Sequence, residues 1–217
     1  MKVLERHLNE AKTRNEFKEI LWIYDFWGYL TESKAAKVVI ELANVKDGSN
    51  ILDVACGTGE MLKKIIQQNP NGNNIGIDLS PDMLKKATKK LNKSDIKNFE
   101  LYEGNALRLN FSDSTFDLLI NSYMVDLLPI EYFDQIASEF YRVLKPNGIV
   151  VISTFSFGTK SIHKFWYLIA KQFPKLLTGC RPVLFMPNLI HAGFKIEDDI
   201  QISQNTFPSQ IIKAKKL

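Results

Sequence analysis

The sequence predicts an α/β protein built on a mostly parallel sheet with helices on both faces. Short apolar segments rich in β-branched residues alternate along the chain with segments whose apolar residues recur at helical spacing. The last two β-rich segments are joined only by a short turn around Asn205, so we expect them to pair antiparallel and to close the sheet as an edge hairpin. At 217 residues the chain can build one sizeable core, and we expect residues 1–217 to form a single domain.

Seven short apolar runs, each bounded by turn residues, are expected to be strands. They cover residues 49–55, 73–79, 98–104, 116–122, 148–155, 194–203 and 208–217. Three segments between them are expected to be crossover helices, at residues 60–69, 81–91 and 130–144. Ser80 and Pro81 supply an N-cap and a first-turn residue for the second of these helices.

Composition and charge argue against several classes of function. The net charge is +4, but acidic residues are spread through the chain, so the sequence has no basic block of the kind that binds nucleic acid. Cys56 and Cys180 form neither a CxxC pair nor a metal-binding spacing with the three histidines, so we expect no metal site. The charged N-terminus differs from a signal peptide, and no apolar run is long enough to span a bilayer. We therefore expect a cytoplasmic protein.

The turn after the first expected strand predicts a ligand site. Asp53 ends the apolar run, and Gly57 and Gly59 turn the chain into a helix, which exposes backbone N–H groups to an anionic or polar ligand. Glycines also make tight turns that bind nothing, and for the turn alone this interpretation has equal weight. Asp78 tips the balance, because an acid about 20 residues further on can accept both hydroxyls of a ribose. A dinucleotide is disfavoured because its fingerprint GxGxxG needs a glycine where Leu62 stands.

The chain resembles one family, the class I S-adenosylmethionine-dependent methyltransferases, in their small-molecule branch. The resemblance covers roughly residues 15–217 and rests on the terminal hairpin and on four ordered motifs, "LDVACGTG", "GIDLSPDML", "FDLLINSYMVDLLP" and "RVLKPNG". It implies a Rossmann-like, doubly wound, seven-stranded sheet, mostly parallel with an antiparallel last strand. It also implies an N-terminal helical segment at residues 1–45 and a helical cap.

The resemblance implies where the cofactor, S-adenosylmethionine, binds. Ten residues are implied for its methionine portion, its ribose, its adenine and its polar end; these are, in that order, Asp53, Ala55, Gly57 and Gly59, then Asp78, then Leu79, Met83, Asn105 and Ala106, and finally Tyr24. Tyr24 belongs to "WIYDFWGYL", which resembles the segment that folds over the cofactor in this family. Packing in the core explains these aromatic residues equally well.

Two residues depart from the family pattern. Ala55 stands where glycine is common, and we expect it to be tolerated because a methyl group leaves room if its φ is negative. Asn105 stands where aspartate is common, and its amide oxygen can still accept a hydrogen bond from the adenine amino group, without the charge.

Methyl transfer depends on positioning more than on side-chain chemistry, because the sulfonium methyl group is already activated and no metal is required. An acceptor can still need a base, and the candidates are Tyr123, Asp126, His163 and Tyr24. Asp126 is better explained as the cap of the helix near Pro129. His163, like His191, is better explained as a packing or surface residue.

Residues 156–191 exceed the length of a minimal crossover and predict a substrate cap. "SIHKFWYLIAKQF" places Ile162, Phe165, Trp166 and Ile169 at helical spacing, with Lys160, Lys164 and Lys171 around them. We expect this segment to cover the methyl group and to form a lipophilic acceptor pocket. The lysines are also compatible with peripheral membrane contact, although an amphipathic helix packed on its own core is the simpler interpretation.

We therefore predict transfer of a methyl group from S-adenosylmethionine to a small or lipophilic acceptor, giving S-adenosylhomocysteine. The sequence leaves open the acceptor atom (oxygen, nitrogen, carbon or sulfur) and the oligomeric state. Two alternatives remain: a binding module that keeps the nucleoside pocket without catalysis, and, less strongly, an oxidoreductase that uses a dinucleotide.

Overall fold

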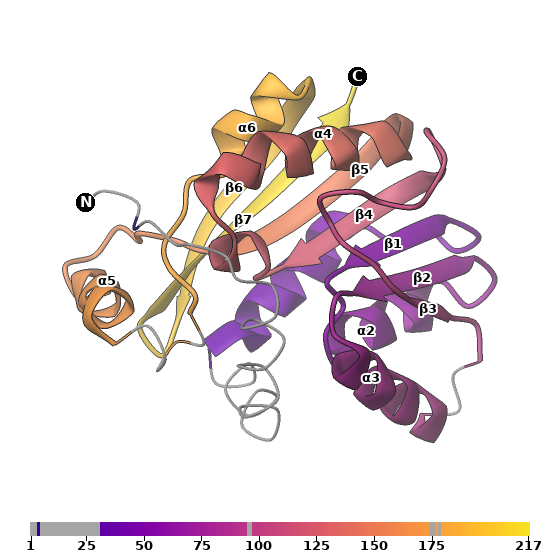
Figure 1. Ribbon diagram of the computed structural model, residues 1–217, viewed down its shortest axis with the longest axis horizontal. Helices are drawn as coiled ribbons and strands as arrows, with labels where there is room; N and C mark the ends of the chain where they lie inside the picture. Colours follow the sequence, from indigo (N-terminus) through magenta and orange to yellow (C-terminus); the bar gives the residue numbers. More distant parts are fainter. Residues whose placement is uncertain (1–3, 5–30, 95–96, 174–176, 178) are drawn as a thin grey trace.

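The computed structural model describes residue 4 and residues 31–94, 97–173, 177 and 179–217. It contains a seven-stranded sheet in the order β3-β2-β1-β4-β5-β7-β6 (Figure 1). The strands are β1 Asn50–Val54, β2 Asn73–Asp78, β3 Glu100–Glu103, β4 Phe116–Ser122, β5 Leu144–Phe155, β6 Phe194–Gln204 and β7 Phe207–Lys216. The five strands from β3 to β5 pair parallel, and β7 runs antiparallel to both of its neighbours. The predicted fold class is confirmed.

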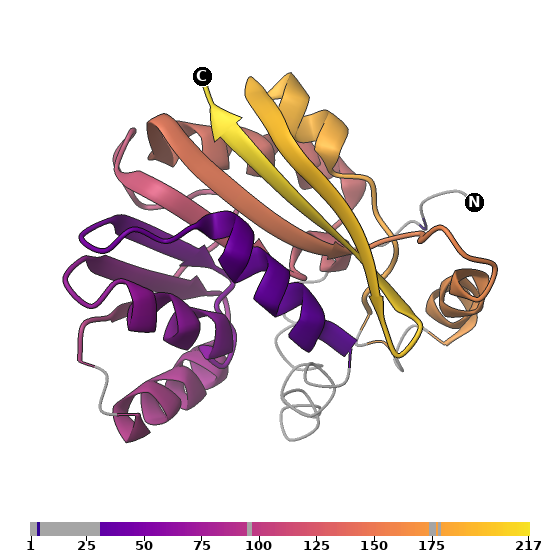
Figure 2. The same cartoon turned by 180° about the vertical axis from the view of Figure 1, so that it is seen from behind.

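Helices cover both faces of this sheet (Figures 1 and 2). They are α2 Glu60–Gln68, α3 Pro81–Lys93, α4 Phe133–Val143, α5 His163–Gln172 and α6 Met186–His191, together with a helix over residues 31–43. One apolar core forms under α4 and α6, and a second forms under α2 and the helix at 31–43. Successive strand residues alternate between these cores, so that Leu119 joins the first and Leu118 and Ile120 join the second. Within the described residues, none of the helices combines the length and the apolar character needed to cross a bilayer.

The hairpin at the end of the chain pairs antiparallel as predicted, but it is not simply added at the edge. β7 inserts between β5 and β6, and β6 therefore forms the edge of the sheet. β5 begins at Leu144 and is therefore longer than the expected 148–155. Its pairing with β4 shifts register between Phe116 and Leu118. A short 3-10 turn, Ile130–Tyr132, precedes α4 in the segment expected to be one helix.

A glycine on strand β2, and not one on the helix, allows α2 to pack closely against the sheet. Leu62 occupies the position at which a dinucleotide fingerprint has its third glycine, and it is fully buried. Gly76 of β2 faces it: a Cβ atom built on Gly76 would lie 2.8 Å from the Leu62 Cδ2 atom and 2.8 Å from that of Leu101. The glycine that permits close approach is therefore on the neighbouring strand rather than on the helix.

Candidate active site

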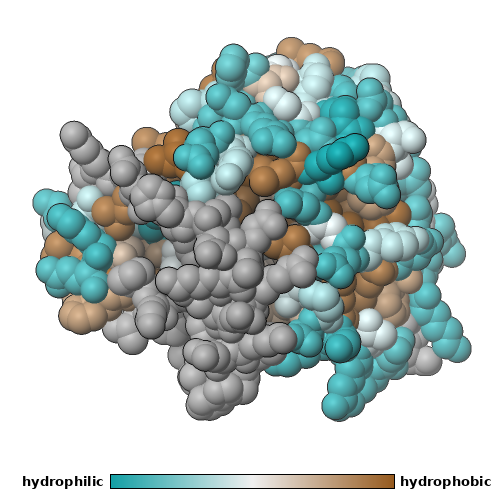
Figure 3. All heavy atoms as spheres, viewed as in Figure 1, coloured by the Kyte–Doolittle hydropathy of each residue, from teal (hydrophilic) through white to brown (hydrophobic). Residues whose placement is uncertain are grey.

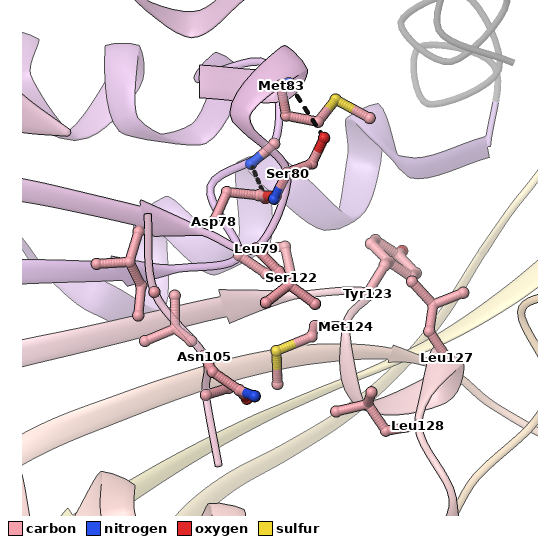
Figure 4. Close-up of a pocket in the computed structure, with 16 residues that line it drawn as sticks. Asp78, Leu79, Ser80, Met83, Asn105, Ser122, Tyr123, Met124, Leu127 and Leu128 are labelled. Carbon is pink, nitrogen blue, oxygen red and sulfur yellow. Dashed lines mark hydrogen bonds between the residues drawn. The ribbon is translucent and has the colours of Figure 1, made fainter. Parts of the chain in front are cut away.

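A pocket lies at the carboxyl ends of β1, β2 and β4, where Val54, Asp78 and Ser122 line it. Figure 4 shows Asp78 and Ser122 on its wall. The chain moves outward from β1 to β2 and β3 and then returns to the other side of β1 as β4. Such a reversal leaves a crevice between neighbouring strands, and ligands of open α/β sheets bind there. The pocket therefore lies where the fold itself favours a ligand.

Seven of the ten residues predicted to bind the cofactor line this pocket: Ala55, Gly57, Asp78, Leu79, Met83, Asn105 and Ala106. Asp53 and Gly59 flank the same loop but are not among the lining residues. Tyr24 lies outside the described residues. The sequence analysis did not single out Ser122, Met124, Leu127 and Leu128, which also line the pocket. All four belong to a motif quoted above, in which only the polar residues Tyr123 and Asp126 were considered.

The loop between β1 and α2 has an unusual backbone. Ala55, Gly57 and Gly59 have φ angles of 59°, 54° and 77°, so all three adopt the left-handed conformation. The condition that we placed on Ala55, a negative φ, is therefore wrong, and its methyl group carries a conformational cost of about 1–2 kcal/mol. A Cβ atom built on Gly57 meets nothing within 4 Å, whereas one built on Gly59 would lie 3.1 Å from the Ala87 Cβ atom. Gly57 thus leaves space on the pocket side, and Gly59 lets α3 approach.

Asp78 joins this loop to the loop after β2. Its Oδ2 atom accepts a hydrogen bond from the Gly57 N–H (2.9 Å), and its Oδ1 atom accepts one from the Ser80 N–H (2.8 Å). The Ser80 hydroxyl in turn accepts from the Met83 N–H and caps α3, as predicted. Burial raises the pKa of Asp78, and the hydrogen bonds from Ser80 and Gly57 oppose that rise. A carboxylate has about four lone-pair sites, so Asp78 can accept further hydrogen bonds from a ligand.

Asp53 is a buried acid on β1, two residues before this loop's first left-handed residue. Its side chain is 1% exposed, and its Oδ2 atom has no hydrogen-bond partner among the described residues. Burial, together with the charge of Asp78, raises the pKa of Asp53 to about 8. The carboxyl group therefore holds a proton at neutral pH, and a cation placed beside it would favour the ionised form.

The opposite wall of the pocket combines apolar side chains with two hydroxyl groups. The Ser122 hydroxyl is buried and has no hydrogen-bond partner among the described residues. The Tyr123 hydroxyl lies 2.6 Å from the Ser209 hydroxyl on β7. Burial, and then the charge of Glu32, holds the pKa of Tyr123 well above its usual value. Tyr123 is therefore a hydrogen-bonding phenol at neutral pH and not a base.

Asp126 does not cap a helix, and this prediction is wrong. It lies in the 3-10 turn Val125–Leu127, is fully buried, and accepts a hydrogen bond from the Phe155 N–H (3.2 Å) at the end of β5. α4 begins only after a further turn and has no side-chain cap.

Glu32 is an acid whose desolvation the sequence did not predict, because nothing in "LTESK" indicates it. Burial, with the charge of Asp126, raises the pKa of Glu32 to about 8.

The remaining candidates from the last third of the chain lie away from the pocket lining. His163 is buried in α5, where its Nδ1 atom accepts a hydrogen bond from the Lys160 N–H, and burial lowers its pKa. His191 is exposed and lies 3.3 Å from an Asp134 oxygen. Arg181 donates hydrogen bonds to the carbonyl oxygens of Asp126 and Leu128. None of the described residues of 156–191 lines this pocket, so a cap over the ligand stays a prediction.

Comparisons with known proteins agree with this geometry. A family model described as a methyltransferase domain matches residues 45–180. The chain is 31% identical over 182 residues to a demethylmenaquinone methyltransferase of Geobacillus stearothermophilus, which is 79% of this chain and 77% of that protein. It is 35% identical over 144 residues to a protein of the same name from Listeria welshimeri, 64% of this chain. That match spans 60% of the Listeria protein's length.

Two solved structures show the same fold at low sequence identity. A SAM-dependent methyltransferase from Aquifex aeolicus has a TM-score of 0.66 at 18% identity, over 97% of this chain and 100% of that one. The N-methyltransferase NodS from Bradyrhizobium japonicum, in complex with S-adenosylhomocysteine, has a TM-score of 0.67 at 13% identity, over 85% of this chain and 87% of that one.

Replacing Asp78 by alanine should weaken S-adenosylmethionine binding by about tenfold to a hundredfold, because one charge-assisted hydrogen bond is worth about 1.5–3 kcal/mol. Isothermal titration calorimetry measures the affinity, and circular dichroism checks that the variant is folded. Asp82→Ala is the matched control, since Asp82 lies in the first turn of α3, close to Asp78 in the chain, but does not line the pocket. Unchanged affinity in a folded Asp78→Ala protein contradicts the assignment.

Comparing Gly57→Ala with Gly48→Ala should distinguish loss of space for the ligand from the strain that alanine places on the backbone. Both glycines have positive φ, and a Cβ atom on either meets nothing within 4 Å, but only Gly57 lines the pocket. Each variant should lose about 1–2 kcal/mol of unfolding free energy in urea. Only Gly57→Ala should also lose cofactor affinity, and an equal loss in both variants would refute the placement of the ligand.

The stability of the protein should fall as the pH rises from about 5 to about 8. The folded protein keeps the Asp53 proton up to about pH 8, whereas an unfolded aspartate releases it near pH 4. The folded state therefore binds more protons across this window, and its unfolding free energy decreases with pH. Asp53→Asn should flatten this dependence in thermal melts, while Asp198→Asn on β6 should not. Identical pH profiles for the wild type and Asp53→Asn would show that Asp53 is ionised.

Proposed function

This chain belongs to the class I S-adenosylmethionine-dependent methyltransferase family, and on that premise we propose that it transfers a methyl group to a small lipophilic acceptor. The proposal rests on one observation, which is that the pocket at the end of β1 has two chemically different sides. One side holds the glycine loop and Asp78, and the other side holds a run of apolar residues after β4. The first side suits a nucleoside with polar groups, and the second suits an apolar molecule.

The residues on the first side fit S-adenosylmethionine. The space beside Gly57 admits a ligand close to the backbone, and Asp78 is placed to accept hydrogen bonds from ribose hydroxyls. Leu79 and Met83 offer apolar contacts for a flat base, and the Asn105 amide oxygen, which accepts the Leu107 N–H at 2.9 Å, has a second lone pair for the base edge. When bound, the cofactor supplies an activated sulfonium methyl group. Asp53 can ionise beside the cationic end of such a ligand.

The residues on the second side fit an acceptor that is mostly apolar. Met124, Leu127 and Leu128 line this wall, and they exclude water from an acceptor bound against them. The unpartnered Ser122 hydroxyl is available to orient a polar atom of the acceptor. Since Tyr123 stays protonated, it can donate a hydrogen bond but does not remove a proton. We propose that this wall acts by positioning and by exclusion of water.

The names of the curated relatives support a lipophilic acceptor. Both relatives described above are named for methyl transfer to demethylmenaquinone. A quinone-type ring with a hydrocarbon tail matches a wall of methionine and leucine better than a sugar or a nucleotide would, because those ligands need several polar partners. We propose residues 156–191 as the segment that covers this acceptor.

Calorimetry and a transfer assay test the proposal together. S-adenosylmethionine should bind and NAD should not, and a labelled methyl group should pass from the donor to a reduced demethylated quinone. Leu128→Gln should keep the donor affinity and lower kcat/KM by about tenfold to a hundredfold, because it places an unpaired amide against the acceptor. Leu217→Gln, at an exposed position outside both the pocket lining and residues 156–191, is the control.

Each outcome has a distinct meaning. Donor binding without a labelled product from a panel of quinones and lipid extracts would favour a binding module that lacks catalysis. Tight NAD binding without donor binding would reject the methyltransferase. Transfer that is unaffected by Leu128→Gln would move the acceptor to another wall.

A further inference from the structure

Helix α5 carries an apolar face that the fold leaves in solvent. Four large apolar side chains in and next to this helix are about half exposed: Ile162 (48%), Phe165 (54%), Leu168 (49%) and Phe173 (57%). Ile169, which lies between them on the helix surface, is partly buried. Of the four residues that the sequence placed on one apolar face, Trp166 and Ile169 pack against the core, whereas Ile162 and Phe165 stay exposed. Soluble proteins expose single apolar residues routinely, but a contiguous face of this kind marks an interaction site.

The exposed face lies between two other faces of the same helix. At 100° per residue, Ile162, Phe165, Leu168 and Phe173 fall within one arc, which only Gln172 interrupts. Lys164 and Lys171 border this arc on one side, and both are exposed. The third face, with His163 and Ala170, is buried against the body of the protein. The helix therefore has two apolar faces. One packs on the body of the protein, and the other is exposed to solvent beside the lysines.

The rest of the fold holds α5 in place at the edge of the molecule. The Trp166 indole N–H donates a hydrogen bond to the Thr206 hydroxyl (3.0 Å), and its ring packs edge-on against Phe207, with centroids 5.4 Å apart. Thr206 belongs to the turn between β6 and β7, and Phe207 is the first residue of β7. Figures 1 and 2 show α5 beside this hairpin and away from the other helices. Figure 3 shows hydrophobic and hydrophilic residues side by side at that edge.

We propose that α5 docks the protein onto the anionic surface of a lipid bilayer. In an interfacial helix the apolar residues enter the boundary between headgroups and acyl chains, and lysines beside them meet anionic headgroups. The arc of Ile162, Phe165, Leu168 and Phe173 supplies the first part, and Lys164 and Lys171 supply the second. Lys160, one turn before the helix, adds a third exposed cation.

A bilayer fits this face better than a second copy of the chain does. A stable protein interface takes roughly 20–30 residues on each side and depletes lysine at its core. The exposed apolar arc has four large side chains and is bordered by lysines, so its area is small and two copies would bring like charges together. A membrane surface needs no matching shape and gains from each lysine.

This inference deepens the proposed function, because a lipophilic acceptor resides in the bilayer, but its test does not require methyl transfer. The wild type should co-sediment with vesicles of equal parts phosphatidylcholine and phosphatidylglycerol, and more weakly with phosphatidylcholine alone. Phe165→Glu should reduce binding by about tenfold or more, since it replaces an apolar ring that would enter the bilayer by a charge. Lys164→Glu with Lys171→Glu should reduce it by about tenfold or more on the anionic vesicles only.

Matched controls use exposed residues on other elements. Ile190→Glu on α6, at an exposed position (55%), should leave vesicle binding unchanged, as should Lys89→Glu with Lys93→Glu on α3. S-adenosylmethionine titration of every variant shows whether the cofactor site is intact, and this separates failure of docking from failure of the proposed function.

Three results would overturn the proposal. One is the absence of binding to either kind of vesicle. Another is binding that Phe165→Glu weakens no more than Ile190→Glu does. The third is a dimer in sedimentation equilibrium that Phe165→Glu dissociates, which would assign the face to a second copy.

Discussion

The two hydrogen bonds that Asp78 accepts hold the site together. The Gly57 N–H comes from the loop after β1, and the Ser80 N–H comes from the loop after β2, so one carboxylate fixes the relative position of two helix starts. The left-handed residues on the first loop direct its N–H groups, and Ser80 passes the constraint on to α3 through its cap on Met83. These protein partners hold the Asp78 carboxylate in one orientation on the pocket wall.

The site pairs this half-buried, pocket-lining acid with a more deeply buried acid that the protein keeps protonated. Asp53 and Asp78 lie close enough for the charge of one to raise the pKa of the other, and the more buried member gives up its charge. Desolvation and the charge of Asp126 likewise raise the pKa of Glu32 to about 8, and both acids help to raise the pKa of Tyr123. Each pair contains a protonated carboxyl group that a nearby cation can ionise. The raised pKa of this group lowers the free energy of unfolding as the pH rises.

The sequence predicts the order of strands and helices well, because a strand buried on both faces needs a continuous apolar run and a helix needs a different period. Seven of the residues that it predicts to bind the cofactor line one pocket, since the carboxyl ends of parallel strands meet at one edge. The failures concern properties that depend on distant partners. The positive φ of Ala55 follows from the geometry of the whole loop, and the full burial of Asp126 follows from its contact with the end of β5. Local sequence contains neither.

The interior position of β7 has a consequence for the order of assembly. β5 and β7 are adjacent in the sheet, but β6, α5 and α6 separate them along the chain. Until β7 arrives, β5 exposes an open edge of backbone N–H and C=O groups, and β6 has no partner in the sheet. β7 follows the six other strands of this sheet along the chain, so it is synthesised after them, and the long-range pairing that seals both strands is made after the parallel pairings. During synthesis the nascent protein therefore presents an unpaired sheet edge, which makes this interval the one most exposed to aggregation.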